Sequence, residues 1–171
     1  KINVTLIANP PDIDNLKFER VVTYLRTLAP PAQRNANDPS VKRGDILFHN
    51  IGCAHCHTPS LRTGSDAAID ELKNQSIKPY TDLLLHDMGE GLADGIQDSL
   101  ASGSEWRTPP LWGIGLTKTV NGNTFFLHDG RARSIEEAIL WHGGEGSESR
   151  KNYSSLSSDD KVDLLNFINS L

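Results

Sequence analysis

Long apolar runs, basic runs and cysteines are all scarce in this sequence. No apolar stretch approaches the ~18 residues that a membrane span requires, so no span is expected. The formal net charge of the 171 residues is −5 and no cluster of lysine and arginine is present, which argues against nucleic acid as a partner. No signal peptide is recognisable, and the first residue is Lys1 instead of Met, which is typical of a mature protein or a fragment of one.

Only two cysteines are present, and both lie in the stretch Cys53-Ala54-His55-Cys56-His57. The spacing Cys-x-x-Cys-His is the attachment sequence of a c-type haem. Two thiols at this spacing form thioether bonds to the vinyl groups of the porphyrin, and the histidine that follows ligates the iron. We therefore expect one covalent haem c on Cys53 and Cys56 with His57 as an axial ligand. No cysteine is left to attach a second haem in this way.

Three other interpretations of the two cysteines are weaker. A disulfide between Cys53 and Cys56 would leave His57 unexplained, and a zinc knuckle would need a second pair of ligands at matching spacing, which is missing. A thioredoxin-like redox pair would follow a strand in a βαβ pattern, which is also missing. Because covalent haem attachment takes place outside the bacterial cytoplasm, a periplasmic or otherwise exported location follows from the haem prediction.

The helix signals predict an all-α, class I cytochrome c-like haem domain with a short β-hairpin and long loops. Helices are expected over residues 13–28, from Asp38-Pro39 to about residue 50, and after the capping sequences that begin at Ser134 and Ser157. The pair Asn121-Gly122 predicts the hairpin, over residues 117–127. We expect residues 1–37 to be an arm, a helix and a linker that end a preceding domain, and residues 38–171 to be the haem domain.

The second axial ligand of the iron decides what such a domain can do. Met88 is the only methionine and a common type of ligand in simple cytochromes c, but its surroundings are polar and glycine-rich. His142 lies at the end of the helix that begins after Ser134, and a helix end aims a side chain more rigidly. The residues alone leave these two candidates nearly equal. The other histidines either fit local hydrogen bonds in turns or lie too close to the attachment sequence to reach the other face of the haem.

Several long motifs resemble the C-terminal haem domain of the di-haem oxidoreductases, also called thiol oxidoreductases. This family is related to the bacterial di-haem cytochrome c peroxidases. The resemblance extends over nearly the whole chain from Asp12 onward and is carried by Gly52–Pro59, Pro79–Gly89, Glu105–Gly113, Leu127–Ala132 and Glu137–Glu145.

The resemblance implies a polypeptide with two haem domains, of which this chain is similar to the electron-transferring half. Its partner would be the N-terminal haem domain of the same parent protein or another redox protein, and the isolated domain would not turn over substrate. A stand-alone monohaem electron shuttle and a haem peroxidase with an open distal site are the alternatives.

The relatives also carry a distal Met or Tyr at the end of a helix that follows a His-x-Gly turn. The matching turn here begins at His128 and the matching helix ends at His142, so the resemblance favours His142 over Met88. Among the other motif residues, Arg107 and Arg131 are candidates to pair with haem propionates, because a guanidinium matches a carboxylate in shape and charge. Trp141, like Trp106 and Trp112, is a candidate to pack in the haem pocket.

Overall fold

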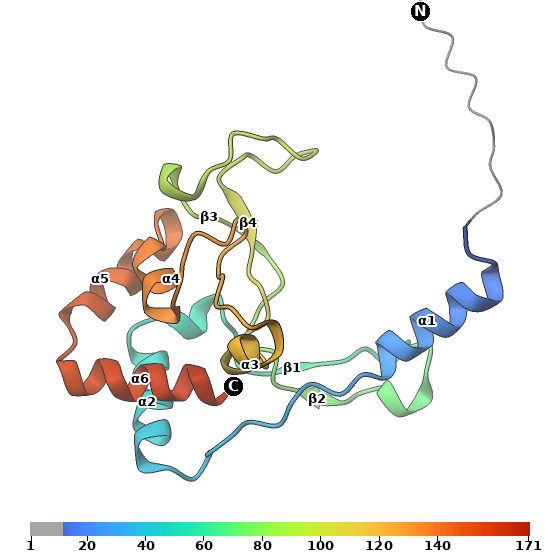
Figure 1. Cartoon of the computed structure of the whole chain (residues 1–171), viewed down its shortest axis with the longest axis horizontal. Helices are drawn as coiled ribbons and strands as arrows, with labels where there is room; N and C mark the ends of the chain where they lie inside the picture. Colours follow the sequence, from blue (N-terminus) through green and yellow to red (C-terminus); the bar gives the residue numbers. More distant parts are fainter. Residues whose placement is uncertain (1–11) are drawn as a thin grey trace, which may run out of the picture. The chain divides into compact units, whose positions relative to one another are not determined.

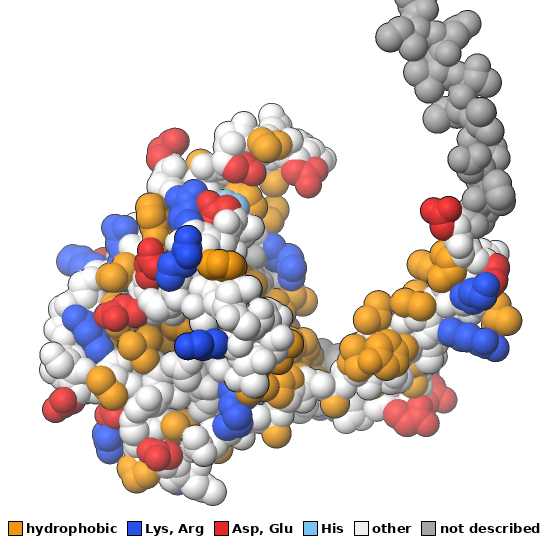
Figure 2. Space-filling model, viewed as in Figure 1, with side chains coloured by type: hydrophobic (Ala, Val, Ile, Leu, Met, Phe, Trp, Pro, Cys, Tyr) orange, Lys and Arg blue, Asp and Glu red, His pale blue; other side chains and the backbone are white. Residues whose placement is uncertain are grey.

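The computed structural model describes residues 12–171, so the arm expected over residues 1–11 lies outside the described residues. The chain divides into two compact units, one that ends at Pro30 and one from Pro31 to Leu171. The first contains α1 (Asn15–Thr27), which begins where the Asp14 carboxylate accepts a hydrogen bond from the Lys17 N–H, 2.8 Å away. Apolar side chains of α1 remain exposed on its surface (Figure 2). The predicted domain boundary near residue 37 stays a prediction.

The core of the second unit is built on α2 (Pro39–Asn50) and α6 (Ser158–Ser170), which pack against each other (Figure 1). Both helices begin as predicted, because Asp38 and Ser157 cap their first backbone N–H groups. The rings of Phe48 and Phe167 meet edge to face, with centroids 5.3 Å apart. The buried cluster around them comprises Val41, Phe48, Ile51, Tyr80, Leu111, Tyr153, Leu164, Phe167, Ile168 and Leu171.

The fold-class prediction of an all-α domain was wrong. Of the residues that the structure describes, 46% are helical and 9% are in strands or bridges, with two small antiparallel sheets, although a cytochrome-like fold is compatible with this mixture. One sheet pairs β1 (Leu61–Arg62) with β2 (Ser76–Ile77), and the other pairs β3 (Leu85–Asp87) with β4 (Glu105–Arg107). Strands this short contain too few residues to show an alternating pattern of apolar and polar side chains, so they were not predicted.

The hairpin predicted around Asn121-Gly122 is a helix instead. Residues Thr117–Asn121 form α3, and Gly122 follows it in the left-handed conformation, with φ +73°, while its N–H donates to the Lys118 carbonyl over 3.0 Å. A left-handed glycine serves a helix C-terminus as well as a hairpin turn, so the Asn-Gly pair does not distinguish the two structures.

The part of the unit that contains His142 consists of α4 (Ile135–Trp141), η5 (Gly144–Gly146) and α5 (Ser147–Ser155). As predicted, the Ser134 hydroxyl caps α4 by accepting from the Glu137 N–H over 3.0 Å, and His142 is the residue at its C-terminal end. No helix among the described residues is long and apolar enough to cross a membrane. The remaining one-turn helices are η1 (Cys53–His55), η2 (Asp70–Leu72), η3 (Glu90–Leu92) and η4 (Ile114–Leu116).

The close approach of α2 and α6 depends on Gly44. A Cβ atom added there would collide with the Asp163 carbonyl oxygen and would lie 2.6 Å from the Phe167 Cβ atom. We expect Gly44→Ala to lower the free energy of unfolding by about 1–3 kcal/mol, because the helices must separate. Gly91→Ala is the matched control, since nothing lies within 4 Å of a Cβ there. Chemical denaturation compares them, and equal stabilities would contradict the packing argument.

The Ser134 cap stabilises the helix that carries His142. Ser134→Ala removes the only side-chain acceptor of the Glu137 N–H seen in the described structure, so we expect the free energy of unfolding to fall by about 1 kcal/mol. Ser154→Ala is a suitable control, because that exposed hydroxyl donates to the Arg150 carbonyl within a helix and caps nothing. Thermal melts of both variants measure the difference, and an unchanged melting temperature for Ser134→Ala would show that the cap does not stabilise the protein.

Candidate functional site

The attachment sequence begins where α2 ends. Gly52 takes the left-handed conformation, with φ +94°, and turns the chain from α2 into η1, which contains Cys53. Cys53 and Cys56 are free and partly buried, and both line one cavity. Burial raises the pKa of Cys53 to about 11, and burial together with the nearby carboxylates of Asp82 and Glu145 raises the pKa of Cys56. Both sulfurs are therefore thiols at neutral pH.

His57 is held by a backbone carbonyl. Its Nδ1 lies 3.0 Å from the carbonyl oxygen of Tyr80, a buried residue whose backbone is left-handed with φ +54°. This bond places a proton on Nδ1 and leaves the lone pair of Nε2 free. Burial lowers the pKa of His57 to about 4, so the ring is neutral at neutral pH, as a metal ligand must be.

His142 is held in the same manner on another element. Its Nδ1 lies 2.8 Å from the carbonyl oxygen of Ala138, one turn earlier in α4. Burial also lowers the pKa of His142, so this second imidazole is neutral with Nε2 free. The ring centroids of His57 and His142 are 6.5 Å apart, with the ring planes inclined by 49°. Two neutral imidazoles from distant parts of the sequence thus lie together.

Both cysteines and both imidazoles line a single cavity of about 480 Å³. This volume is within the range of small-molecule and cofactor pockets, and the walls are mainly apolar. Segments from most of the second unit contribute to these walls, including Phe48, Leu92, Trp106, Leu111, Phe125, Phe126, Leu127, Ile135, Ile139 and Ile168.

Met88, the alternative distal ligand, lies next to His142. A Cβ atom at Gly146 would be 3.2 Å from Cδ2 of His142 and 3.3 Å from Cε of Met88, so the two side chains meet at one point. Both line the cavity. The structure brings the two candidate ligands to the same side of the site, and the choice between them stays a prediction.

The predicted propionate partners occupy different environments. Arg107 lines the cavity. Arg131 is not among the lining residues, because its guanidinium pairs with Asp129 over 2.6 Å and donates to the Gly91 carbonyl. That guanidinium also lies 4.8 Å from the ring centre of Trp141, which is itself outside the lining. The roles predicted for these three residues in cofactor binding stay predictions.

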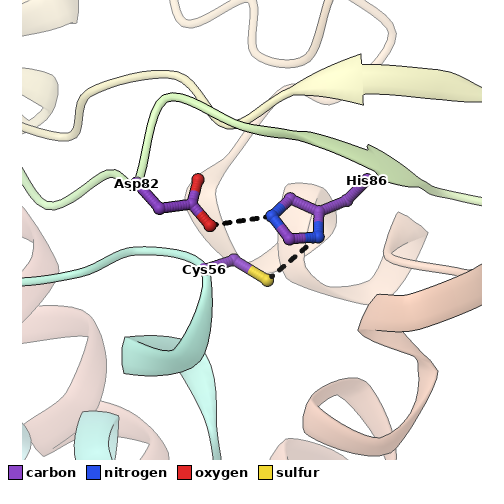
Figure 3. Close-up of side chains that lie close together, drawn as sticks. All are labelled: Cys56, Asp82 and His86. Atoms are coloured by element: carbon purple, nitrogen blue, oxygen red, sulfur yellow. Dashed lines mark hydrogen bonds and ion pairs between the residues drawn. The ribbon is translucent and has the colours of Figure 1, made fainter. Parts of the chain in front are cut away.

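Sequence reasoning missed a cluster around His86 at the edge of the attachment sequence (Figure 3). The ring nitrogen Nε2 lies 2.8 Å from the Asp82 carboxylate, and Nδ1 lies 2.8 Å from the Glu145 carboxylate and 3.7 Å from the Cys56 sulfur. The hydrogen bond to Glu145, followed by that to Asp82, raises the pKa of His86. The sequence suggested Asp87 as the local partner of His86, and no sequence signal indicated a partner 59 residues away.

A second missed pair is Trp106 and His128, whose rings stack in parallel with centroids 3.5 Å apart. The Trp106 indole N–H donates to the Leu92 carbonyl over 3.0 Å, which fixes the plane of the stack. Both rings line the cavity, so they form a rigid aromatic part of its wall. Arg150, which sequence reasoning did not select, also lines the cavity.

The residues present fit a haem. When two imidazoles ligate one metal from opposite sides, their ring centres are separated by two metal–nitrogen bonds of about 2 Å each and by the distance from each nitrogen to its ring centre, roughly 6 Å in all. The ring centres of His57 and His142 are 6.5 Å apart. Two free thiols line the same cavity, and thiols are the groups that form thioether bonds to a haem c. The apolar lining suits a flat, largely apolar cofactor.

Comparisons with known proteins support a haem-binding redox domain. Residues 8–171 match the family described as "Di-haem oxidoreductase, putative peroxidase". Among solved structures, a hydrazine synthase from Kuenenia stuttgartiensis, studied under xenon pressure, is similar with a TM-score of 0.56 and 20% identity. The match covers 93% of this chain and 56% of that one, and at this identity it indicates the fold alone. No curated protein matches the chain. Because the family match extends over nearly all of the sequence, the chain belongs to the di-haem oxidoreductase family.

Proposed function

We propose that this chain is the electron-transferring haem domain of a di-haem, peroxidase-like oxidoreductase. The observation that carries the proposal is the convergence of two thiols and two neutral, backbone-anchored imidazoles on one cavity. The chain spans about half the length of the hydrazine synthase chain that it matches. A partner haem domain in the same polypeptide, or another redox protein, would exchange electrons with it outside the cytoplasm.

Each residue of the site has a specific part in holding the haem. Cys53 and Cys56 supply the sulfurs of two thioether bonds. His57 provides one axial nitrogen and Tyr80 orients it, while His142 provides the other. When bound, the haem supplies an iron that alternates between the ferric and ferrous states. Imidazole stabilises ferric iron better than a thioether does, so a pair of histidines would set a lower reduction potential than a His/Met pair.

Filling both axial positions limits the chemistry of the domain. Peroxide has no position at which to bind while His57 and His142 both hold the iron. The stacked Trp106 and His128 form part of the mainly apolar wall of the cavity. The domain would therefore pass electrons, and the turnover of substrate would belong to a site elsewhere in the parent protein.

Covalent attachment is the first test of this function. Protein matured with its haem should retain the colour after denaturation and extraction with acidic acetone, and its mass should exceed that of the polypeptide by one haem. The double variant Cys53→Ala/Cys56→Ala should lose the haem on extraction, because no thioether bond forms. Extraction of all colour from the unmodified protein would contradict the proposal.

The second test concerns the distal ligand. His142→Ala should convert the ferric haem from low-spin to high-spin or to a His/Met form, because the anchored imidazole is gone. Met88→Leu should leave the low-spin spectrum and the reduction potential unchanged. Optical and magnetic spectra of the two variants, together with potentiometric titration, measure these differences.

The opposite pattern would assign the ligand to Met88. In that case the unmodified protein would show a weak sulfur-to-iron absorption band near the red end of the visible spectrum. Met88→Leu would then abolish this band, and His142→Ala would leave it in place.

A further inference from the structure

One short segment, residues 80–89, contacts the site on the side of the attachment sequence. The Tyr80 carbonyl accepts from His57, as described above. The Thr81 N–H then donates to the Thr58 carbonyl over 3.1 Å, and the Asp82 N–H donates to the Cys56 carbonyl over 2.9 Å. The beginning of this segment is therefore fixed to the backbone that carries both the proximal imidazole and the second cysteine.

The other end of the same segment is fixed to the loop that follows His142, residues 143–146, which we call the distal loop. The contact is made by Glu145, three residues after His142. One oxygen of the Glu145 carboxylate lies 2.8 Å from Nδ1 of His86, and the other accepts from the Asp87 N–H over 3.0 Å. A single side chain thus uses both oxygens to hold the distal loop against β3. No other ion pair described in residues 12–171 joins β3 to this loop.

The backbone of residues 87–89, at the end of β3 and directly after it, lies too close to the backbone of the distal loop for side chains to separate them. A Cβ atom at Gly143 would lie 2.6 Å from the Met88 carbonyl oxygen, and one at Gly89 would lie 2.9 Å from the Gly144 nitrogen. Gly144 also takes the left-handed conformation, with φ +48°. The Glu145 contacts therefore act at a surface where the two backbones are already in direct contact.

His86 connects the two ends of this segment, and Figure 3 shows its contacts with Asp82 and Cys56. Its two ring nitrogens are held by Asp82 on one edge and Glu145 on the other, while Asp82 is bonded through its N–H to Cys56. The arrangement could suggest a metal site built from Cys56, Asp82 and His86. However, the Asp82 carboxylate and the Cys56 sulfur lie beside different ring nitrogens of His86, and both of these nitrogens already contact a carboxylate. In the proposed function, moreover, the sulfur is committed to the haem.

We propose that Glu145 is a positioning residue of the haem site, which fixes the distance between the two axial imidazoles by clasping His86 and Asp87. This inference rests on the proposed function. The chain of contacts runs from His57 through residues 80–87 to Glu145 and ends at His142, which is carried by the same loop. When the clasp is broken, only α4 and the backbone contacts of Gly143 and Gly144 with residues 87–89 hold this loop, and His142 leaves the iron more often. An added ligand then competes for the distal position more effectively.

The test uses the full chain loaded with haem, and cyanide is the competing ligand. Glu145→Gln removes the charge that holds His86, and we expect cyanide to bind the ferric haem roughly tenfold faster, because a hydrogen bond to a neutral amide is weaker than one to a carboxylate. Glu145→Asp keeps the charge with a shorter reach and should restore part of the resistance to cyanide. Glu148→Gln is the matched control, because that exposed carboxylate contacts only Lys151, over 3.9 Å.

The outcomes separate the two proposals. If the unmodified protein is low-spin and both Glu145→Gln and Glu148→Gln bind cyanide at the same rate as the unmodified protein, the positioning role is wrong and the proposed function still stands. If Glu145→Gln does not retain haem, His86→Gln replaces it, since this variant breaks the same bond and keeps that of Glu145 to the Asp87 N–H. An unchanged cyanide rate there also overturns the role. An unmodified protein that is high-spin, or lacks covalent haem, removes both proposals.

Discussion

The site depends on two hydrogen bonds from imidazole rings to backbone carbonyl groups. Tyr80 holds His57 and Ala138 holds His142, each through Nδ1, so the same nitrogen stays free on both rings. Burial adds a second constraint, because desolvation is the largest cause that lowers the pKa of both rings and keeps them neutral. Orientation and charge state are thus determined by backbone and packing before a metal arrives. Each ring loses little further freedom on ligation, which strengthens binding.

The two sides of the site have unequal support. The proximal side rests on the core, since Phe48 packs within 6.4 Å of His57 and within 6.0 Å of Tyr80, centroid to centroid, and lies in the long helix α2. The distal side is carried by the seven residues of α4 and a glycine-rich loop. A ligand on a short helix needs further attachment to be as well placed as one backed by the core. The contacts of Glu145 with β3 provide that attachment.

The parts of this structure that could be predicted from the sequence are those whose causes act within a few residues. The Asp38 and Ser134 caps each bond a backbone N–H two or three positions later, so their helices were predicted correctly. The strands β3 and β4 are stabilised by a partner about twenty residues away and are too short for a pattern of their own. Gly122 shows a different limit, because its left-handed backbone suits two kinds of structure and the tertiary context decided for a helix.

The same distinction applies to the candidate site and bears on its distal ligand. The attachment sequence is local and was evident, whereas the bond of Glu145 to His86 joins residues 59 positions apart. The residues by themselves left Met88 and His142 nearly equal, the family resemblance favoured His142, and in space the two are neighbours. The difference between them is preorganisation. The His142 ring is oriented by the Ala138 carbonyl, while the Met88 sulfur has no hydrogen bond among the described residues and must be ordered by the iron itself. The anchored imidazole pays less conformational entropy on binding, so it is the better candidate.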